Sequence, residues 1–183
     1  MTNLQAFQAR ICSTVAGYLI QDQKVLLVKH KKLGIWLAPG GHVESGELPH
    51  RAAEREVWEE TGVRVEAVDF WHSLPKTTIS ELLPNPALTN LHWVCEANYQ
   101  NRLVSRDPSQ PQKTKLWPNG CEQHVCFLYF VKPIDGVDFR QNLEETDGIG
   151  WFSADEILKL ETTDDLKSEL SWMLKLAQQR QLG

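Results

Sequence analysis

The sequence lacks any apolar run of about 18 residues, which is the length that a transmembrane helix requires. Its first ten residues also lack the charged start and apolar centre of a secretory signal peptide, so no export signal is expected. Basic charge is not in excess, because 19 lysines and arginines stand against 24 acidic residues and the formal net charge is −5. We therefore expect neither a nucleic-acid-binding arm nor a basic membrane-binding face.

Cysteine is also scarce. Four cysteines in 183 residues do not form the disulfide framework of a small secreted protein. A zinc site is the alternative, and its candidate ligands are Cys121, His124 and Cys126, with His92 and Cys95 upstream. Their spacing is not C-x2-C, and the segment from His124 is predicted to be a strand, in which successive side chains face opposite ways. We therefore expect buried free thiols and a reducing cytoplasm.

What the sequence does contain is typical of a globular protein: 42% of its residues are hydrophobic, and 183 residues are most simply one domain. Alternating and β-branched runs predict strands over residues 13–20, 24–29, 63–71, 91–97, 124–131 and 150–152. Helices are predicted from Pro49 to Gly62, with the proline in the first turn and the glycine at the end, and over 154–160 and 163–179.

Three stretches interrupt this pattern. Residues 33–46 are rich in glycine and proline and are predicted to be an irregular loop. Residues 74–90 and 100–120 each contain three prolines. Because loops of this length are usually either functional or disordered, we expect at least one of them to be a substrate-side flap or a partner surface, with disorder as the alternative for 101–118.

Three glutamates share one face of the helix that begins near Pro49. Glu56, Glu59 and Glu60 stand at positions i, i+3 and i+4, where Cβ atoms are about 5–6 Å apart. Carboxylates placed in this way repel one another by about 0.2–0.5 kcal/mol per pair in an isolated helix. Residues 41–63 carry a net charge of −4, so they hold nearly all of the chain's negative excess. The pattern predicts that one or more divalent cations lie against this face.

The same segment resembles the Nudix box, the signature of the Nudix hydrolase superfamily. Its fixed positions are Gly41, Glu47, Arg55, Glu56, Glu59, Glu60 and Gly62, with aliphatic residues at Val57 and Val63. The resemblance implies a single Nudix hydrolase domain over residues 1–183, with variable insertions at about 74–90 and 100–120. It also implies an α/β fold, in which an α/β/α sandwich contains a mixed β-sheet and the box forms a loop–helix–loop.

The resemblance further implies a metal site. Glu56, Glu59, Glu60 and the backbone carbonyl of Gly40 would bind Mg²⁺ or Mn²⁺, because Mg²⁺ prefers oxygen ligands in octahedral geometry. Glycine at this point would let the backbone approach an ion closely.

Other box residues would support that site. Arg55 would orient the carboxylates, and Glu47 would pair with Arg51 or Arg55 at the start of the helix. Gly41 and Gly62 are expected to be structural.

The reaction implied is the attack of water on a phosphorus of a diphosphate. Metal ions neutralise and orient the phosphates and acidify a bound water, and a carboxylate accepts its proton. That base would be Glu56 or Glu59 within the box, or Glu145 or Glu144 in the loop before the final strand. The alternative for residues 142–147 is a solvated acidic turn, since loops are commonly polar.

Three residues outside the box are candidates for substrate binding. Trp36, just before the glycine-rich loop, could stack on a nucleobase, although most tryptophans serve in packing. His92 and His124, on predicted strands, could reach a phosphate, although a histidine on a strand is more often simply hydrogen-bonded.

We therefore expect a hydrolase, dependent on Mg²⁺ or Mn²⁺, that cleaves a pyrophosphate bond in a nucleoside diphosphate linked to another group. Its partner would be a small-molecule nucleotide rather than a nucleic acid or a membrane, and a homodimer stays open. Markers of ADP-ribose, diadenosine polyphosphate and NADH pyrophosphatases are absent downstream of the box, so the substrate is not specified. The alternative of another class is a non-catalytic nucleotide sensor, but such domains often lose the box carboxylates that this chain retains.

Overall fold

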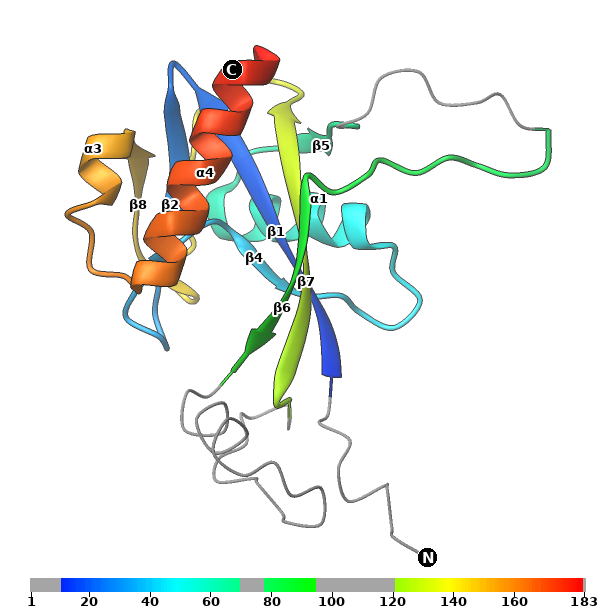
Figure 1. Ribbon diagram of the computed structural model, residues 1–183, viewed down its shortest axis with the longest axis horizontal. Coiled ribbons are helices and arrows are strands. Elements are labelled where there is room, and N and C mark those ends of the chain that lie inside the picture. The colour runs from blue at the N-terminus through cyan, green and yellow to red at the C-terminus, as the bar shows by residue number, and fades with distance from the viewer. Residues whose placement is uncertain (1–10, 70–77, 95–120, 183) are drawn as a thin grey trace, which may run out of the picture.

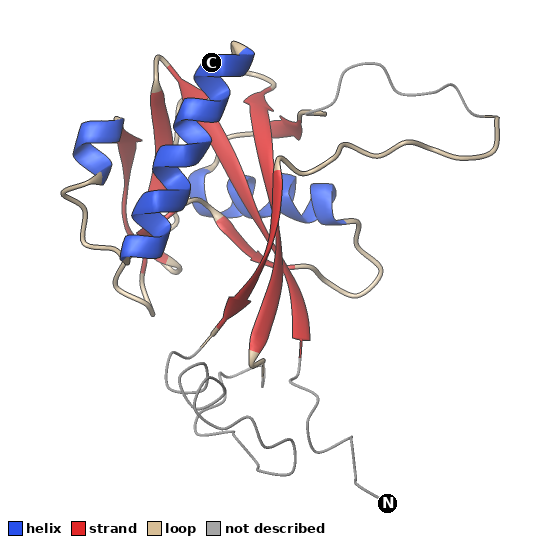
Figure 2. Ribbon diagram, in the orientation of Figure 1, coloured by secondary structure: helices blue, strands red, loops and turns tan. Residues whose placement is uncertain are grey.

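The computed structural model describes residues 11–69, 78–94 and 121–182. A mixed eight-stranded sheet forms its centre, with α1 on one face and α4 on the other (Figures 1 and 2). The strands are β1 (Ile11–Gln21), β2 (Lys24–His30), β3 (Trp36–Leu37), β4 (Gly40–His42), β5 (Val65–Ala67), β6 (Leu88–Trp93), β7 (Gln123–Pro133) and β8 (Thr146–Phe152). The helices are α1 (Pro49–Thr61), α3 (Ala154–Ile157) and α4 (Asp164–Arg180). This arrangement confirms the expected α/β sandwich around a mixed sheet.

The long strand β1 organises the sheet. It pairs in parallel with β7 and antiparallel with β2 and β4, while β5 and β6 pair with β7, and β3 and β8 with β2. Because successive side chains of a strand face opposite ways, β1 supplies both halves of the core. Val15 and Leu19 belong to the apolar cluster under α1, and Tyr18 belongs to the cluster under α4. No helix in the described part of the chain is long and apolar enough to cross a membrane.

Small residues allow α1 to lie close to the sheet. Ala52, Ala53 and Val57 are fully buried against it, and a Cβ atom at Gly17 of β1 would lie only 2.4 Å from a methyl group of Val57. This close packing fixes the height of α1 above the sheet and so the position of the glutamates on the helix.

Several predicted boundaries are wrong. The segment predicted as an irregular loop contains β3 and β4, because Gly40 and Gly41 bring the backbone close enough to pair with Ala16 and Val15 of β1. The predicted insertion 74–90 ends in strand β6, which begins at Leu88. The last strand begins at Thr146 rather than at residue 150, and α3 ends at Ile157. Residues 95–120, which include the whole of the second predicted insertion, lie outside the described residues.

The expectation of free thiols is wrong for two of the cysteines. Cys12 and Cys121 form a disulfide with their Cα atoms 6.0 Å apart, whereas Cys126 is free and Cys95 lies outside the described residues. The pairing follows from the parallel register of β1 and β7, which sets Cys12 opposite His124. Since the two cysteines are 109 positions apart in the sequence, no local spacing predicts their contact.

Gly62 ends α1 in the left-handed conformation, with φ of 73° and its N–H donating to the carbonyl of Trp58 at 2.8 Å. A Cβ atom here would also lie 3.2 Å from the Cβ of Arg140. We expect Gly62→Ala to lower the free energy of unfolding, measured with urea, by about 1–2 kcal/mol for the backbone conformation, plus the cost of the contact. Gly34→Ala is the control, because Gly34 has φ of 70° but open space around its Cβ. Equal losses in the two variants would show that the contact with Arg140 contributes nothing.

Candidate active site

The glutamates of α1 differ in their exposure to solvent. Glu60 is 2% exposed and Glu56 is 9% exposed, whereas the Glu59 side chain is 37% exposed. Both buried side chains contact β4. A Cβ atom on Gly41 would lie 2.3 Å from Oε1 of Glu56, and the N–H of Gly40 donates to Oε2 of Glu60 at 3.1 Å. The helix therefore presents two buried carboxylates and one half-exposed carboxylate beside the backbone of the two glycines of β4, Gly40 and Gly41.

Arg55 supplies part of the positive charge that these carboxylates require. Its guanidinium donates to both carboxylate oxygens of Glu47, at 2.9 and 3.0 Å. It also donates at 2.8 Å to Glu56 and to Glu59, and at 3.0 Å to the carbonyl of His42. The hydrogen bond from Arg55 lowers the pKa of Glu47. Glu47 thus pairs with Arg55 and not with Arg51, the other candidate from the sequence.

Glu60 lies beyond the reach of this arginine. Within the described chain it accepts one hydrogen bond, from Gly40, and forms no ion pair. Burial raises the pKa of Glu60 to about 8, and the nearby charges of Glu56, Glu145 and Glu59 add to the effect. Burial likewise raises the pKa of Glu56, against the opposing influence of Arg55. A buried carboxylate of this kind is stable in its ionised form only beside a cation.

The donor set fits a hard divalent cation such as Mg²⁺ or Mn²⁺. Its candidate ligands are all oxygens, which these ions prefer. The glycine backbone lets the carboxylates approach β4 closely, since a Cβ at Gly41 would overlap all three carboxylate atoms of Glu56, at 2.3–2.8 Å. Glu56, Glu59 and Glu60 could hold such an ion beside the backbone of Gly40.

The loop before β8 lies against the C-terminal end of α1. The N–H of Arg140 donates to the carbonyl of Thr61 at 2.6 Å, and the N–H of Asn142 donates to the carbonyl of Glu60 at 3.3 Å. The charge of Glu145 raises the pKa of both buried glutamates, which places it near them. Glu144 is exposed, and its N–H donates to the side chain of Asn142 at 3.0 Å. Both glutamates of this loop are exposed, and Glu145 is the one whose charge acts on the glutamates of α1.

The three residues predicted to bind substrate lie on strands β3, β6 and β7 and not on α1 or the loop before β8. The Trp36 ring in β3 packs edge-on against Phe152, with centroids 4.8 Å apart, and a Cβ at Gly148 would lie 2.9 Å from it. Packing therefore holds this tryptophan. His92 in β6 is exposed and lies opposite half-buried His124 in β7, with ring centroids 6.3 Å apart. The two histidines therefore face each other across β6 and β7, whereas the glutamates lie on helix α1.

His42 is a neighbour that the sequence prediction missed. Its ring lies 5.0 Å from that of His124, and its carbonyl accepts a hydrogen bond from Arg55. Burial lowers the pKa of His124 to about 4, helped by the imidazoles of His42 and His92, so its ring is neutral at pH 7. The only signal in the sequence was the position of His42 directly after two glycines. Because the sequence did not predict strand β4, it gave no reason to expect His42 opposite Thr14 of β1.

Sequence comparison identifies relatives of this arrangement. The NUDIX domain family model matches residues 11–106. A MutT-like protein of Streptomyces ambofaciens is 39% identical over 127 residues, which cover 68% of this chain and 76% of that protein. The m7GpppN-mRNA hydrolase NUDT17 of Xenopus laevis is 36% identical over 134 residues, which cover 67% of this chain and 43% of that protein. The match thus spans less than half the length of the second relative.

Solved structures share the same architecture. A NUDIX-family hydrolase from Clostridium perfringens gives a TM-score of 0.62 at 24% sequence identity, covering 90% of this chain and 96% of that chain. A NUDIX hydrolase from Nitrosomonas europaea gives a TM-score of 0.59 at 22% sequence identity, covering 92% of this chain and 90% of that chain. At such identities the likeness concerns the fold alone.

Proposed function

Because this chain belongs to the Nudix family, and is therefore a hydrolase, we propose that it uses Mg²⁺ or Mn²⁺ to cleave a pyrophosphate bond in a nucleoside diphosphate linked to another group. The observation that carries this proposal is Glu60, a buried carboxylate with no cationic partner within the described chain, beside Glu56 and the glycine backbone of β4. The Xenopus relative is named as an m7GpppN-mRNA hydrolase, which supports a substrate that contains a nucleotide diphosphate linkage.

The residues of the site would have two roles, metal binding and orientation of the metal ligands. Glu56, Glu59 and Glu60, with the carbonyl of Gly40, would hold the ions. When bound, divalent ions neutralise the diphosphate and lower the pKa of a coordinated water. Arg55 fixes the carboxylate orientations of Glu56 and Glu59 through hydrogen bonds at 2.8 Å, so that these ligands need no rearrangement.

A general base must hold a free lone pair near the attacking water. One oxygen of Glu59 already accepts a hydrogen bond from Arg55. Glu145 lies near Glu56 and Glu60, on a loop that hydrogen bonds to α1. We therefore assign proton removal to Glu145, with Glu59 as the alternative base.

For this assignment, Glu145→Gln should lower kcat about 10²–10⁴-fold, the usual contribution of a general base, with a much smaller change in KM. Glu144→Gln, one residue away, is the matched control and should stay within about twofold of the wild type. A small effect of Glu145→Gln together with a large effect of Glu59→Gln would transfer the role to Glu59.

The function itself is tested by a substrate panel. The purified protein, treated with chelator and resupplied with Mg²⁺ or Mn²⁺, is incubated with nucleotide sugars, dinucleotides, nucleoside triphosphates and capped nucleotides in ¹⁸O-labelled water. We expect metal-dependent hydrolysis of at least one class, with ¹⁸O in a phosphate-containing product. Tight nucleotide binding without turnover on any member would favour a sensor, and turnover unaffected by chelator would contradict the proposed metal site.

A further inference from the structure

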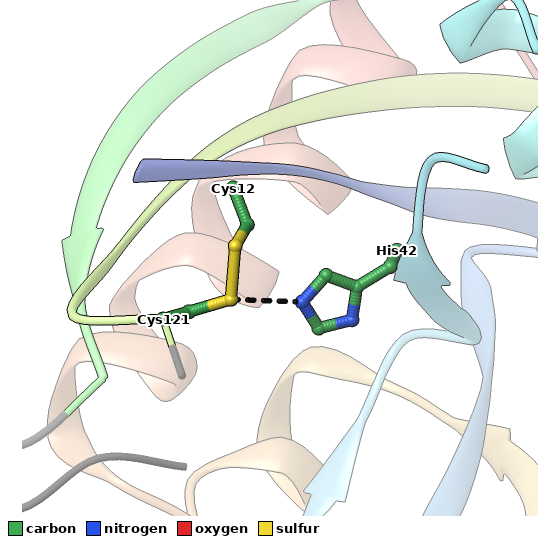
Figure 3. The surroundings of a disulfide bond; sticks show 3 residues. All are labelled: Cys12, His42 and Cys121. Atoms are coloured by element: carbon green, nitrogen blue, oxygen red, sulfur yellow. Dashed lines mark hydrogen bonds between the residues drawn. A yellow bond between two sulfur atoms is a disulfide. The ribbon is translucent and has the colours of Figure 1, made fainter. Parts of the chain in front are cut away.

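A second group of potential metal ligands lies on the face of the sheet opposite α1. The structure places Cys12 of β1, His42 of β4 and Cys121 just before β7 together, with their ligand atoms all within 4.8 Å of one another (Figure 3). Nε2 of His42 lies 3.5 Å from Sγ of Cys121. Gly41 faces Glu56 of α1. Because successive residues of a strand point to opposite faces of the sheet, the imidazole of His42 points to the face away from α1. This group is therefore distinct from the glutamates of α1.

His124 offers a fourth ligand to the group. It lies directly opposite Cys12 in the parallel register of β1 and β7, and its ring centroid is 5.0 Å from that of His42. Its Nε2 atom is buried and has no hydrogen-bond partner within the described chain. A buried polar atom without a partner is costly, and a metal ion is one of the groups that can satisfy it.

We propose that Cys12, Cys121, His42 and His124 bind one Zn²⁺-class ion when the disulfide between the two cysteines is reduced. Two sulfur and two nitrogen donors are a usual tetrahedral zinc set, with Zn–S of about 2.3 Å and Zn–N of about 2.0–2.1 Å. Such bond lengths place a sulfur and a nitrogen donor about 3.6 Å apart. The separation of 3.5 Å between Cys121 and His42 agrees with this value.

The disulfide and the metal site are alternative states of the same two cysteines. A dithiol reductant supplies two electrons and two protons: the S–S bond breaks, two thiols form, and the reductant becomes a cyclic disulfide. The ion then forms two metal–sulfur bonds and releases the two thiol protons to solvent. Two thiolates balance the charge of the ion, so the filled site is neutral where Cys121 is 1% exposed. In a reducing compartment such as the expected cytoplasm, the thiol state is the one available to the metal.

The two sites would select different ions. Thiolate and imidazole donors favour Zn²⁺ and Co²⁺, whereas carboxylates favour Mg²⁺ and Mn²⁺. The proposed ion would join β1 and the start of β7 to β4, the strand that also contacts Glu56 and Glu60 from its other face. It would therefore hold this part of the sheet together from the face opposite α1.

Co²⁺ added to the full-length protein is a specific probe, because only thiolate ligands give an intense near-ultraviolet charge-transfer band and only a tetrahedral site gives strong visible bands. We expect the reduced protein to bind one Co²⁺ per chain with both signatures, and Zn²⁺ to displace it. The oxidised protein should show neither signature. Glu60→Gln, which alters the other site, should give the same spectrum as the wild type when reduced.

Variants identify the ligands. Cys121→Ser and Cys12→Ser should each weaken binding at least tenfold, and His124→Asn should weaken it without removing the charge-transfer band. Cys126→Ser is the matched control, since this free cysteine also lies on β7 and should leave binding unchanged. If Cys121→Ser does not fold, His124→Asn and Cys12→Ser still decide the assignment. Absence of a charge-transfer band from the reduced wild type, or its loss in Cys126→Ser alone, would overturn the proposal.

Discussion

Glu60→Gln should reduce hydrolysis at least about 10²-fold while the protein remains folded. The substitution keeps the size of the side chain and an oxygen that can accept the hydrogen bond from Gly40, so the local packing is retained. What it removes is the negative charge of a carboxylate that is 2% exposed and has no cationic partner within the described residues. Loss of a ligand to a catalytic metal removes charge stabilisation of the transition state, which explains the large expected effect.

The matched control is Glu54→Gln on the same helix. Glu54 is also largely buried, with 14% of its side chain exposed, but it bonds to Arg51 and to the N–H of Ala67 instead of contacting β4. We expect this variant to retain activity within about threefold. Equal losses in the two variants would point to general damage to α1 and would contradict a specific role for Glu60.

Glu60→Gln should also make the metal-free protein more resistant to unfolding at neutral pH. Burial raises the pKa of Glu60 to about 8 in the folded state, whereas its usual value is 4.5. The folded state therefore binds the proton more tightly than the unfolded state, and stability falls as pH rises from about 4.5 to 8. In chelator, Glu60→Gln should lack this fall, so its urea midpoint should exceed that of the wild type increasingly over this range.

Arg55→Leu should be the most destabilising single substitution in the site. It removes five hydrogen bonds and leaves Glu47, Glu56 and Glu59 without their shared cation. Removing one partner of a buried ion pair costs about 3–5 kcal/mol; because 23% of the Arg55 side chain is exposed, we expect a loss of about 2–3 kcal/mol in urea unfolding. Hydrolysis should fall as well, since the carboxylates lose their fixed orientation.

Two comparisons separate charge from geometry at this position. Arg51→Leu, one turn earlier and 64% exposed, breaks a single ion pair with Glu54 and should cost about 0.5 kcal/mol or less. Arg55→Lys keeps the charge but not the planar fork, so it should recover only part of the stability. Added Mg²⁺ should also restore part of the stability of Arg55→Leu by neutralising the same carboxylates. If Mg²⁺ stabilises the wild type and Arg55→Leu equally, the arginine and the metal do not act on a common charge cluster.

The glutamates could be read from the sequence because a helix converts spacing directly into a shared face. Pro49 at the start and Gly62 at the end defined that helix. The source of compensating charge was only half predicted. The sequence indicated a cation for all three glutamates. In the structure Arg55 already pairs with Glu56 and Glu59, and within the described residues only Glu60 of the three has no cationic partner.

The remainder depended on contacts between distant parts of the chain. The two short strands after residue 35 carry no alternating pattern, so β4 and with it the place of His42 could not be predicted. The Cys12–Cys121 contact likewise depends on the parallel pairing of β1 with β7. The proximity of Glu145 to the glutamates depends on a loop whose backbone bonds to the end of α1.

The binding of Mn²⁺ to the oxidised, metal-free protein, followed by electron paramagnetic resonance of the free ion, tests the central claim most directly. In this state the two cysteines are joined and do not compete for metal. We predict that the wild type and Glu54→Gln bind at least one Mn²⁺ per chain, and that the Glu56→Gln/Glu60→Gln double variant binds at least one fewer. A double variant that binds Mn²⁺ with the stoichiometry and affinity of the wild type would contradict the assignment of these glutamates as the metal site.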